Sequence, residues 1–238
     1  MTKSSGTILD GECRPGGQGA RTAPCNGFRP PLPNVMFCSS YIYSPRGAGF
    51  VSEASRQLCA RLKTADVTWL PACARSVHDQ VNRHDALAGL FAGDVILVPV
   101  PGCAPRSTRV WAAERLAMAL CGMGLGRRVW QGVRRCSAVR RSATAINNAR
   151  PTVQQHFASL SIATSACPPG RMVLIDDVIT KGRTILAAAA RLYEAFPNAD
   201  IRAFALVRTM GLLPKVARLL EPCQGVVRWA AGDAWRDP

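Results

Sequence analysis

Short apolar runs alternate with amphipathic segments along most of this chain, and the alternation predicts buried strands connected by helices. Continuous apolar stretches indicate three strands, at Val95–Val100, Met172–Ile175 and Ile201–Val207. A further short strand is predicted at Val67–Leu70. Continuous runs of this kind are typical of a parallel sheet that helices cover on both faces, so we expect such a sheet.

Apolar residues at helical spacing predict three helices, which cover Gly49–Lys63, Arg109–Cys121 and Thr184–Phe196. Ser52 is the candidate N-cap of the first helix, and Pro197 ends the third. The last helix lies between two predicted strands, which is the pattern of a βαβ unit with a right-handed crossover. The predicted fold class is therefore α/β, an open, mainly parallel sheet with flanking helices.

Two segments depart from this pattern. Residues 1–35 are rich in Gly, Pro, Ser and Arg and show no periodicity, which predicts a disordered tail ahead of one domain over residues 36–238. Residues 122–169 contain few strong apolar runs and are predicted to form a mobile loop region. Neither segment is expected to add strands or helices to the core.

The composition fits a single globular domain without membrane partners. The chain has 238 residues and is 48% hydrophobic, which suffices for a sizeable core and excludes a wholly disordered chain. The sequence contains neither an apolar run of membrane-spanning length nor a secretory signal, so a cytoplasmic location is expected. The ten cysteines form no C-x-x-C pair and the three histidines are scattered, so we expect no protein metal site.

The formal net charge is +15, and arginine supplies most of it. Between Val95 and Arg171 the only acid among eleven arginines is Glu114. Such a stretch attracts phosphorylated ligands or nucleic acid, although biased codon usage or a solvated basic face gives the same composition. Four of these arginines could close over a ligand as a flexible loop, or form part of that solvated face: Arg134, Arg135, Arg140 and Arg141.

The segment RMVLIDDVITKGRTIL carries the most specific chemistry. An apolar strand leads into Asp176 and Asp177, then into a loop with Thr180, Gly182 and Thr184, and then into a helix. Ligands of open parallel sheets bind outside the carboxyl ends of the strands. Glycine lets the backbone approach a phosphate, the helix N-terminus offers free N–H groups, and carboxylates accept hydrogen bonds from ribose hydroxyls. The spacing does not match a Walker A loop.

This segment resembles the motif with which type I phosphoribosyltransferases bind 5-phosphoribosyl-1-pyrophosphate (PRPP). The resemblance implies that Asp176 and Asp177 are the catalytic pair that holds the ribose hydroxyls. It also implies a loop around the 5-phosphate made of Thr180, Lys181, Gly182, Arg183 and Thr184. Lys181 stands where a small hydroxyl residue is commoner in that family.

A second stretch, VILVPVPGCAPR, is similar to the strand and pyrophosphate loop of the ComF-like branch of the family. The residues implied in pyrophosphate binding are Gly102, Cys103, Ala104 and Arg106. The following RVWAAERLA is similar to that branch's R-G-F-N-Q-A-x-x-L, with Ala112 and Ala113 in place of Asn and Gln. The resemblance covers roughly residues 40–208, and it is strongest at the 5-phosphate loop.

The resemblance implies transfer of a phosphoribosyl group from PRPP to an unidentified acceptor with release of pyrophosphate. Mg²⁺ would be held mainly through PRPP oxygens rather than by a dedicated set of ligands. The alternative is a non-catalytic protein that senses PRPP or a nucleotide, or that associates with DNA in a competence-type role. Ala112 and Ala113 favour the alternative, whereas the intact acids and loop favour the enzyme.

Overall fold

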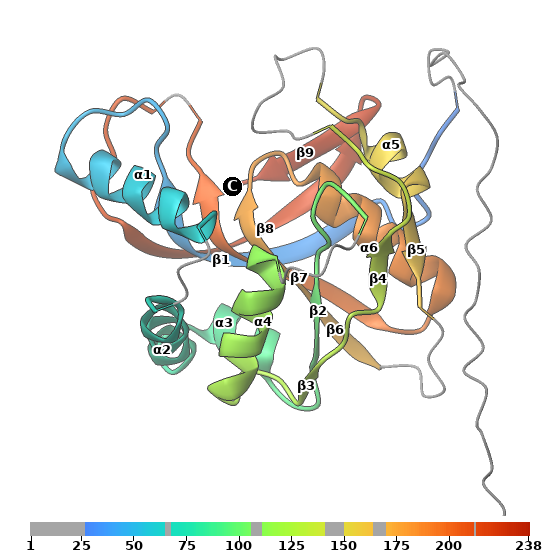
Figure 1. The fold of residues 1–238 in the computed structure, drawn as a ribbon, viewed down its shortest axis with the longest axis horizontal. Coiled ribbons are helices and arrows are strands. Elements are labelled where there is room, and N and C mark those ends of the chain that lie inside the picture. The colour runs from blue at the N-terminus through green and yellow to red at the C-terminus, as the bar shows by residue number, and fades with distance from the viewer. Residues whose placement is uncertain (1–26, 65–67, 106–110, 141–149, 164–169, 212) are drawn as a thin grey trace, which may run out of the picture.

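The computed structural model describes residues 27–64, 68–105, 111–140, 150–163, 170–211 and 213–238. Its centre is a seven-stranded sheet (Figure 1). The strands, in spatial order, are β3 (Arg128–Val129), β2 (Ile96–Pro99), β6 (Arg171–Ile179), β7 (Asp200–Thr209), β1 (Asn34–Tyr43), β8 (Leu220–Ala230) and β9 (Asp233–Asp237). The first five strands are parallel, and β8 and β9 extend the sheet as an antiparallel hairpin.

Helices cover both faces of the sheet and enclose two apolar cores. The helices are α1 (Phe50–Leu62), α2 (Leu70–Val81), α3 (Asp85–Phe91), α4 (Ala112–Gly122), α5 (Val153–Ala158) and α6 (Arg183–Ala195). The first four pack on one face; α5 and α6 pack on the other with a two-stranded sheet of β4 (Val133–Arg135) and β5 (Leu160–Ile162). Burial on both faces explains why β2, β6 and β7 are continuous apolar runs.

The predicted α/β class and its mainly parallel sheet are confirmed. The three apolar runs form β2, β6 and β7, and the three amphipathic segments form α1, α4 and α6. Strand β6 continues to Ile179, four residues beyond the predicted end. The acids at 176 and 177 therefore lie within the strand rather than in the loop that follows it.

Several local predictions were wrong. Residues 68–70, the described part of the strand predicted at Val67–Leu70, do not form a strand. Leu70 instead begins α2, because the helically spaced apolar residues of α2 are buried against the core. Ser52 is not an N-cap, because α1 begins one turn earlier, after Gly49, and the Ser52 side chain is buried inside the helix. The loop predicted over 122–169 contains β3, β4, α5 and β5, each too short for a periodic signal.

The predicted boundary at residue 36 is too late, because residues 27–35 already pack against the domain. The Phe28 ring lies 5.4 Å from that of Phe157 and 5.7 Å from that of Trp229, measured between centroids. Val35, the second residue of β1, is buried and pairs with Val227 of β8. Aromatic packing on the sheet thus orders a segment whose composition alone predicts disorder. The rest of the predicted tail, residues 1–26, lies outside the described residues.

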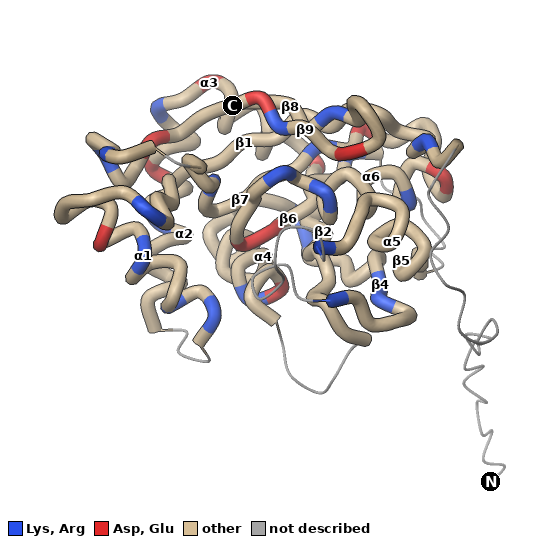
Figure 2. Tube along the Cα trace, turned by 90° about the horizontal axis from the view of Figure 1, so that it is seen from above, with Lys and Arg blue, Asp and Glu red and all other residues tan. Residues whose placement is uncertain are grey.

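Within the described ranges, every helix falls short of a membrane span in length and apolar character. Lysine and arginine positions are distributed along most of the trace, with acids between them (Figure 2). Many basic side chains are paired with these acids, as in Arg127–Asp94 and Arg202–Asp200. The high net charge is therefore spread over the molecule, and part of it is locally compensated.

Candidate functional site

The predicted pyrophosphate segment follows β2, and the predicted ribose-binding acids lie near the carboxyl end of β6. The two segments therefore lie side by side. The strands are neighbours in the sheet, and Pro99 pairs with Ile175. The loop of residues 102–104 (the 102–104 loop) consequently begins beside the acid pair, Asp176 and Asp177. In parallel sheets this edge is where ligands bind, because the loops of successive strands converge there.

The two carboxyl groups of the acid pair lie next to each other without a basic partner in the described part of the chain. Both carboxyl groups are half-buried, and each accepts a backbone hydrogen bond at 3.0 Å, from the N–H groups of Asp177 and Val178. Burial and the adjacent Asp177 carboxylate raise the pKa of Asp176 well above its usual range. No basic side chain of the described residues forms an ion pair with either acid. The pair is therefore free to accept hydrogen bonds from hydroxyl groups or to face a cation.

Gly182 forms the turn between β6 and α6, and no other residue fits there. It is the N-cap of α6 in the left-handed conformation, with φ of 82° and ψ of 14°. A Cβ atom at this position would come within 2.6 Å of Val227 Cγ2 on β8. The turn aims the unpaired N–H groups of the first turn of α6 at the edge of the sheet, where they can bind an anion.

A small cavity of about 50 Å³ lies in front of this helix end. Its walls come from Arg150, His156, Asp176, residues 178 and 179, the loop of residues 180–184 (the 180–184 loop) and Ile185. All five predicted 5-phosphate residues therefore line one cavity together with one member of the acid pair. Their backbone N–H groups and the hydroxyls of Thr180 and Thr184 are donors suited to a phosphate.

The basic side chains of the 180–184 loop are engaged by a residue far along the chain. The Arg183 guanidinium donates from Nε and Nη2 to the Asp233 carboxylate at 2.6 and 2.5 Å. Lys181 Nζ donates to the same carboxylate at 3.2 Å. Arg183 Nη1 also donates to the carbonyl of Pro151 at 3.1 Å. These side chains border the cavity, but their charges are already partly compensated.

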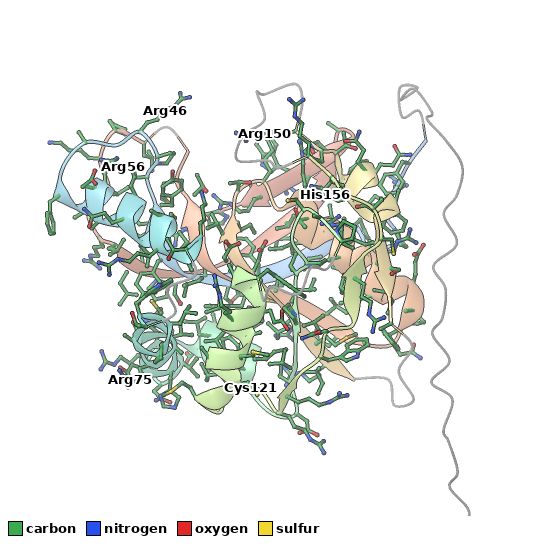
Figure 3. All side chains as sticks on the ribbon, in the orientation of Figure 1. Arg46, Arg56, Arg75, Cys121, Arg150 and His156 are labelled. Carbon is green, nitrogen blue, oxygen red and sulfur yellow. The ribbon has the colours of Figure 1, made fainter. Side chains whose placement is uncertain are left out.

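His156, which the sequence pattern did not single out, belongs to this cavity. It lies on α5 with 4% of its surface exposed, and its Nε2 is 3.5 Å from Thr184 Oγ1. Its Nδ1 is buried without a partner among the described residues. Figure 3 shows that His156 and Arg150 come from the same stretch of chain beside α5. The capping box of Thr152 and Gln155 is the one sequence signal for this helix.

Burial, together with the guanidinium groups of Arg135 and Arg183, lowers the pKa of His156 to about 4. The imidazole is accordingly neutral at pH 7. With the proton on Nε2 it donates to Thr184 Oγ1, which leaves the Thr184 hydroxyl hydrogen for an acceptor in the cavity. In that tautomer, His156 orients a donor of the 180–184 loop.

We expect acid to destabilise the wild-type protein more than a His156→Gln variant. Between the ordinary value of 6.5 and the folded value of about 4, the unfolded chain binds a proton that folded His156 does not. The stability contributed by neutral His156 is therefore present above pH 6.5 and lost as the pH falls toward 4, by about 3 kcal/mol. Urea unfolding across this range measures the effect, and parallel pH profiles of the two proteins would contradict it.

Arg135 of β4 supports the 102–104 loop through a hydrogen bond. This arginine is 5% exposed, and its Nε donates to the Gly102 carbonyl at 2.9 Å. Its Nη1 donates to Ser159 Oγ at 2.5 Å and to the His156 carbonyl at 3.5 Å. The Val139 N–H adds a bond of 2.7 Å to the Cys103 carbonyl. Arg135 therefore joins the 102–104 loop to the helix that carries His156.

A second cavity, of about 300 Å³, opens beside the 102–104 loop. Gly102, Ala104, Trp111 and Arg134 are among the residues that line it. The predicted pyrophosphate residue Arg106 lies outside the described residues, as does Arg141. The predicted arginine cluster does not act as one loop: Arg135 is buried, whereas Arg134 and Arg140 are exposed.

A third cavity, of about 700 Å³, lies on the other side of Thr180 and Lys181. It is lined by the ends of β7 and β9, including Thr209, Trp235 and Arg236. Trp235 is 56% exposed, and the Thr209 hydroxyl is buried with no partner in the described part of the chain. Apolar surface from Met210, Trp235 and Pro238 lies beside the charged residues Lys181, Arg208, Glu221 and Arg236, so the cavity offers both apolar and ionic contacts to a ligand.

The described residues contain no group of three or more His, Cys, Asp or Glu side chains that could hold a metal ion. Among the described residues, the acid pair offers carboxylate oxygens without a basic partner beside the cavity at the N-terminus of α6. Two carboxylates fit a hydrated Mg²⁺ whose remaining ligands come from a bound phosphate.

A scan against protein-family models finds none that matches this chain, and a search among curated proteins finds no relative. The function is therefore inferred from the geometry of the site and the motif that builds it.

Proposed function

We propose that this protein is a phosphoribosyltransferase of the type I fold that binds PRPP at the carboxyl ends of β2 and β6. The observation that carries the proposal is the cavity formed jointly by Asp176 and the 180–184 loop at the N-terminus of α6. The helix N–H groups and the hydroxyls of Thr180 and Thr184 bind the 5-phosphate. The acid pair accepts hydrogen bonds from the ribose hydroxyls.

The leaving group occupies the neighbouring strand end. Pyrophosphate is bound by the backbone of the 102–104 loop, which Arg135 supports, and Arg134 borders the adjoining cavity. The acceptor nucleophile forms a bond to C1 of the ribose while the bond between C1 and the pyrophosphate oxygen breaks. The electron pair of the broken C1–O bond leaves with the pyrophosphate oxygen. The protein contributes by positioning the groups and by donors directed at the departing charge.

Magnesium fits this arrangement because the acid pair has no cationic partner among the described residues. The acid pair would face the ion, while PRPP oxygens and water supply its other ligands. When bound, Mg²⁺ neutralises charge on the pyrophosphate.

The acceptor enters from the cavity beside Thr180 and Lys181. This cavity shares no lining residue with the one beside the 102–104 loop, so an acceptor and pyrophosphate can bind at separate places. Its exposed Trp235 offers an apolar face, and the unpartnered Thr209 hydroxyl offers one polar contact. Lys181, Arg208 and Arg236 line the same cavity, so these features favour a small acceptor with both an apolar face and polar or anionic groups.

Calorimetry with PRPP tests the proposal directly. PRPP should bind in the presence of Mg²⁺ and bind at least tenfold more weakly when EDTA removes the ion, because the unpaired acids then repel the ligand. Ribose 5-phosphate, which has no pyrophosphate, is the control and should depend far less on Mg²⁺. PRPP affinity that is insensitive to Mg²⁺ would contradict the role of the acid pair.

Pyrophosphate release distinguishes the enzyme from a PRPP sensor. Incubation of the protein with PRPP, Mg²⁺ and a panel of nucleobases should release pyrophosphate with at least one acceptor. Tight PRPP binding without release in any combination would favour the sensing role, for which the alanines at 112 and 113 in α4 are the supporting observation.

A further inference from the structure

The hairpin of β8 and β9 reaches back to the 180–184 loop. Its turn has two successive residues with positive φ, Ala231 at 49° and Gly232 at 79°, which is the backbone of a tight type I′ hairpin. The turn places Asp233 at the start of β9, over the loop. Arg236 Nη1 fixes the same hairpin to the Ile179 carbonyl at 3.1 Å.

Asp233 is an ionised partner of both loop cations. Burial raises the pKa of its carboxyl, but the hydrogen bonds from Arg183 and from the Ala234 N–H outweigh this and lower it below the usual value. The Ala234 N–H donates to Oδ1 at 2.8 Å, while the Arg183 contact is a two-point bond of the strong, charge-assisted kind. The carboxylate therefore keeps its charge at neutral pH.

The cations that Asp233 holds are the ones that border the cavity at the end of α6. Lys181 and Arg183 line that cavity, whereas Asp233 contacts them from the hairpin and does not line it. One carboxylate against two cations leaves a single net positive charge on these three side chains. A phosphate in the cavity and Asp233 would share the same two donors.

We propose that Asp233 is an internal counterion of the 180–184 loop that competes with phosphate for Lys181 and Arg183 and so limits the affinity of the site. The inference rests on the proposed function only in that the cavity binds a phosphate. Because a carboxylate held this close repels an incoming dianion through partly hydrated protein, its charge weakens binding by about tenfold. Asp233 thus sets the affinity of the site for phosphate from outside the motif.

Asp233→Asn is the sharpest test, because asparagine keeps an oxygen acceptor for Arg183 and for the Ala234 N–H but removes the charge. Affinity for inorganic phosphate and for ribose 5-phosphate, measured by calorimetry, should rise about tenfold, and it should depend more steeply on salt. Asp233→Glu, which keeps the charge, should not show this rise.

Glu194→Gln is the matched control. Glu194 forms an ion pair with another arginine of α6, Arg191, at 2.9 Å and away from the cavity. The control should leave phosphate affinity within twofold. If Asp233→Asn fails to melt cooperatively, Asp233→Ser replaces it, since serine also keeps an acceptor without charge.

The wild type should bind phosphate, and the uncharged variant should bind it more tightly. Unchanged or weaker phosphate affinity in the variant would overturn the counterion role and leave the transferase proposal standing. Failure of both proteins to bind phosphate would overturn it as well. Tighter phosphate binding by Asp233→Asn in a protein that neither binds PRPP with Mg²⁺ nor releases pyrophosphate would support the counterion and reject the transferase.

Discussion

Replacing both acids of the pair, in Asp176→Asn with Asp177→Asn, should weaken PRPP binding more than 100-fold and leave the fold intact. Each charge-assisted hydrogen bond to a ribose hydroxyl contributes about 1.5–3 kcal/mol, so two of them account for a loss of this size. Calorimetry with PRPP and Mg²⁺ measures the affinity. Asp94→Asn, at an exposed acid paired with Arg127, is the control and should bind as the wild type does.

The same double variant should be more stable than the wild type at pH 7. Burial and Asp177 raise the pKa of Asp176 in the folded protein, so the folded state binds its proton more tightly than the unfolded chain does. Asp176 therefore destabilises the fold increasingly as the pH rises above the ordinary value near 4, and amide replacements remove this effect. Urea unfolding should show the advantage of the variant growing from pH 4 to pH 7.

An unchanged PRPP affinity would contradict the ribose-binding role of the acid pair. A variant that is less stable than the wild type at pH 7 would instead contradict the inference that the ionised acid pair destabilises the fold. The two readouts are independent, and a gain in stability with a loss of binding is characteristic of residues kept for function.

Arg135→Met should cost about 2–4 kcal/mol of stability and weaken PRPP binding at least tenfold. The variant leaves the Gly102 carbonyl and Ser159 without their buried donor, and unsatisfied buried groups of this kind are expensive. The 102–104 loop then loses its support, so affinity for PRPP should fall more than affinity for ribose 5-phosphate. Urea unfolding and calorimetry measure the two effects.

Arg134→Met is the matched control for stability, because Arg134 is the neighbour of Arg135 on β4 and its side chain is exposed. Its free energy of unfolding should stay within about 0.5 kcal/mol of the wild type. Equal stability of the two variants would mean that Arg135 does not hold the loop. An equal loss of PRPP and ribose 5-phosphate affinity in Arg135→Met would separate the 102–104 loop from pyrophosphate binding.

The main elements of the fold could be predicted from the sequence, since their signals are local. Strands β2, β6 and β7 are buried on both faces, and each is visible as a continuous apolar run. Helices α1, α4 and α6 are long enough to show helical spacing. The shorter elements between residues 122 and 169 span too few residues for either period to emerge, and β8 alternates around a half-exposed face.

The motif at the candidate site was also readable, because strand, turn and helix start are consecutive in the chain. The left-handed Gly182 and the free N–H groups of α6 follow from nine neighbouring residues, 176–184. No long-range information is needed to place two acids and the 180–184 loop at one strand end. The residues of this short segment are therefore enough to predict the strand, the turn and the helix start of the candidate site.

The side chains that surround this segment come from distant parts of the chain, so the folded structure is needed to identify them. Asp233 lies 50 residues from Arg183, His156 lies 28 from Thr184, and Arg135 lies 33 from Gly102. These pairs meet because of the strand order and the return of the C-terminal hairpin, and such contacts have no periodic signature in the sequence. The charge available to a phosphate at the 180–184 loop is set by one of these distant residues, Asp233.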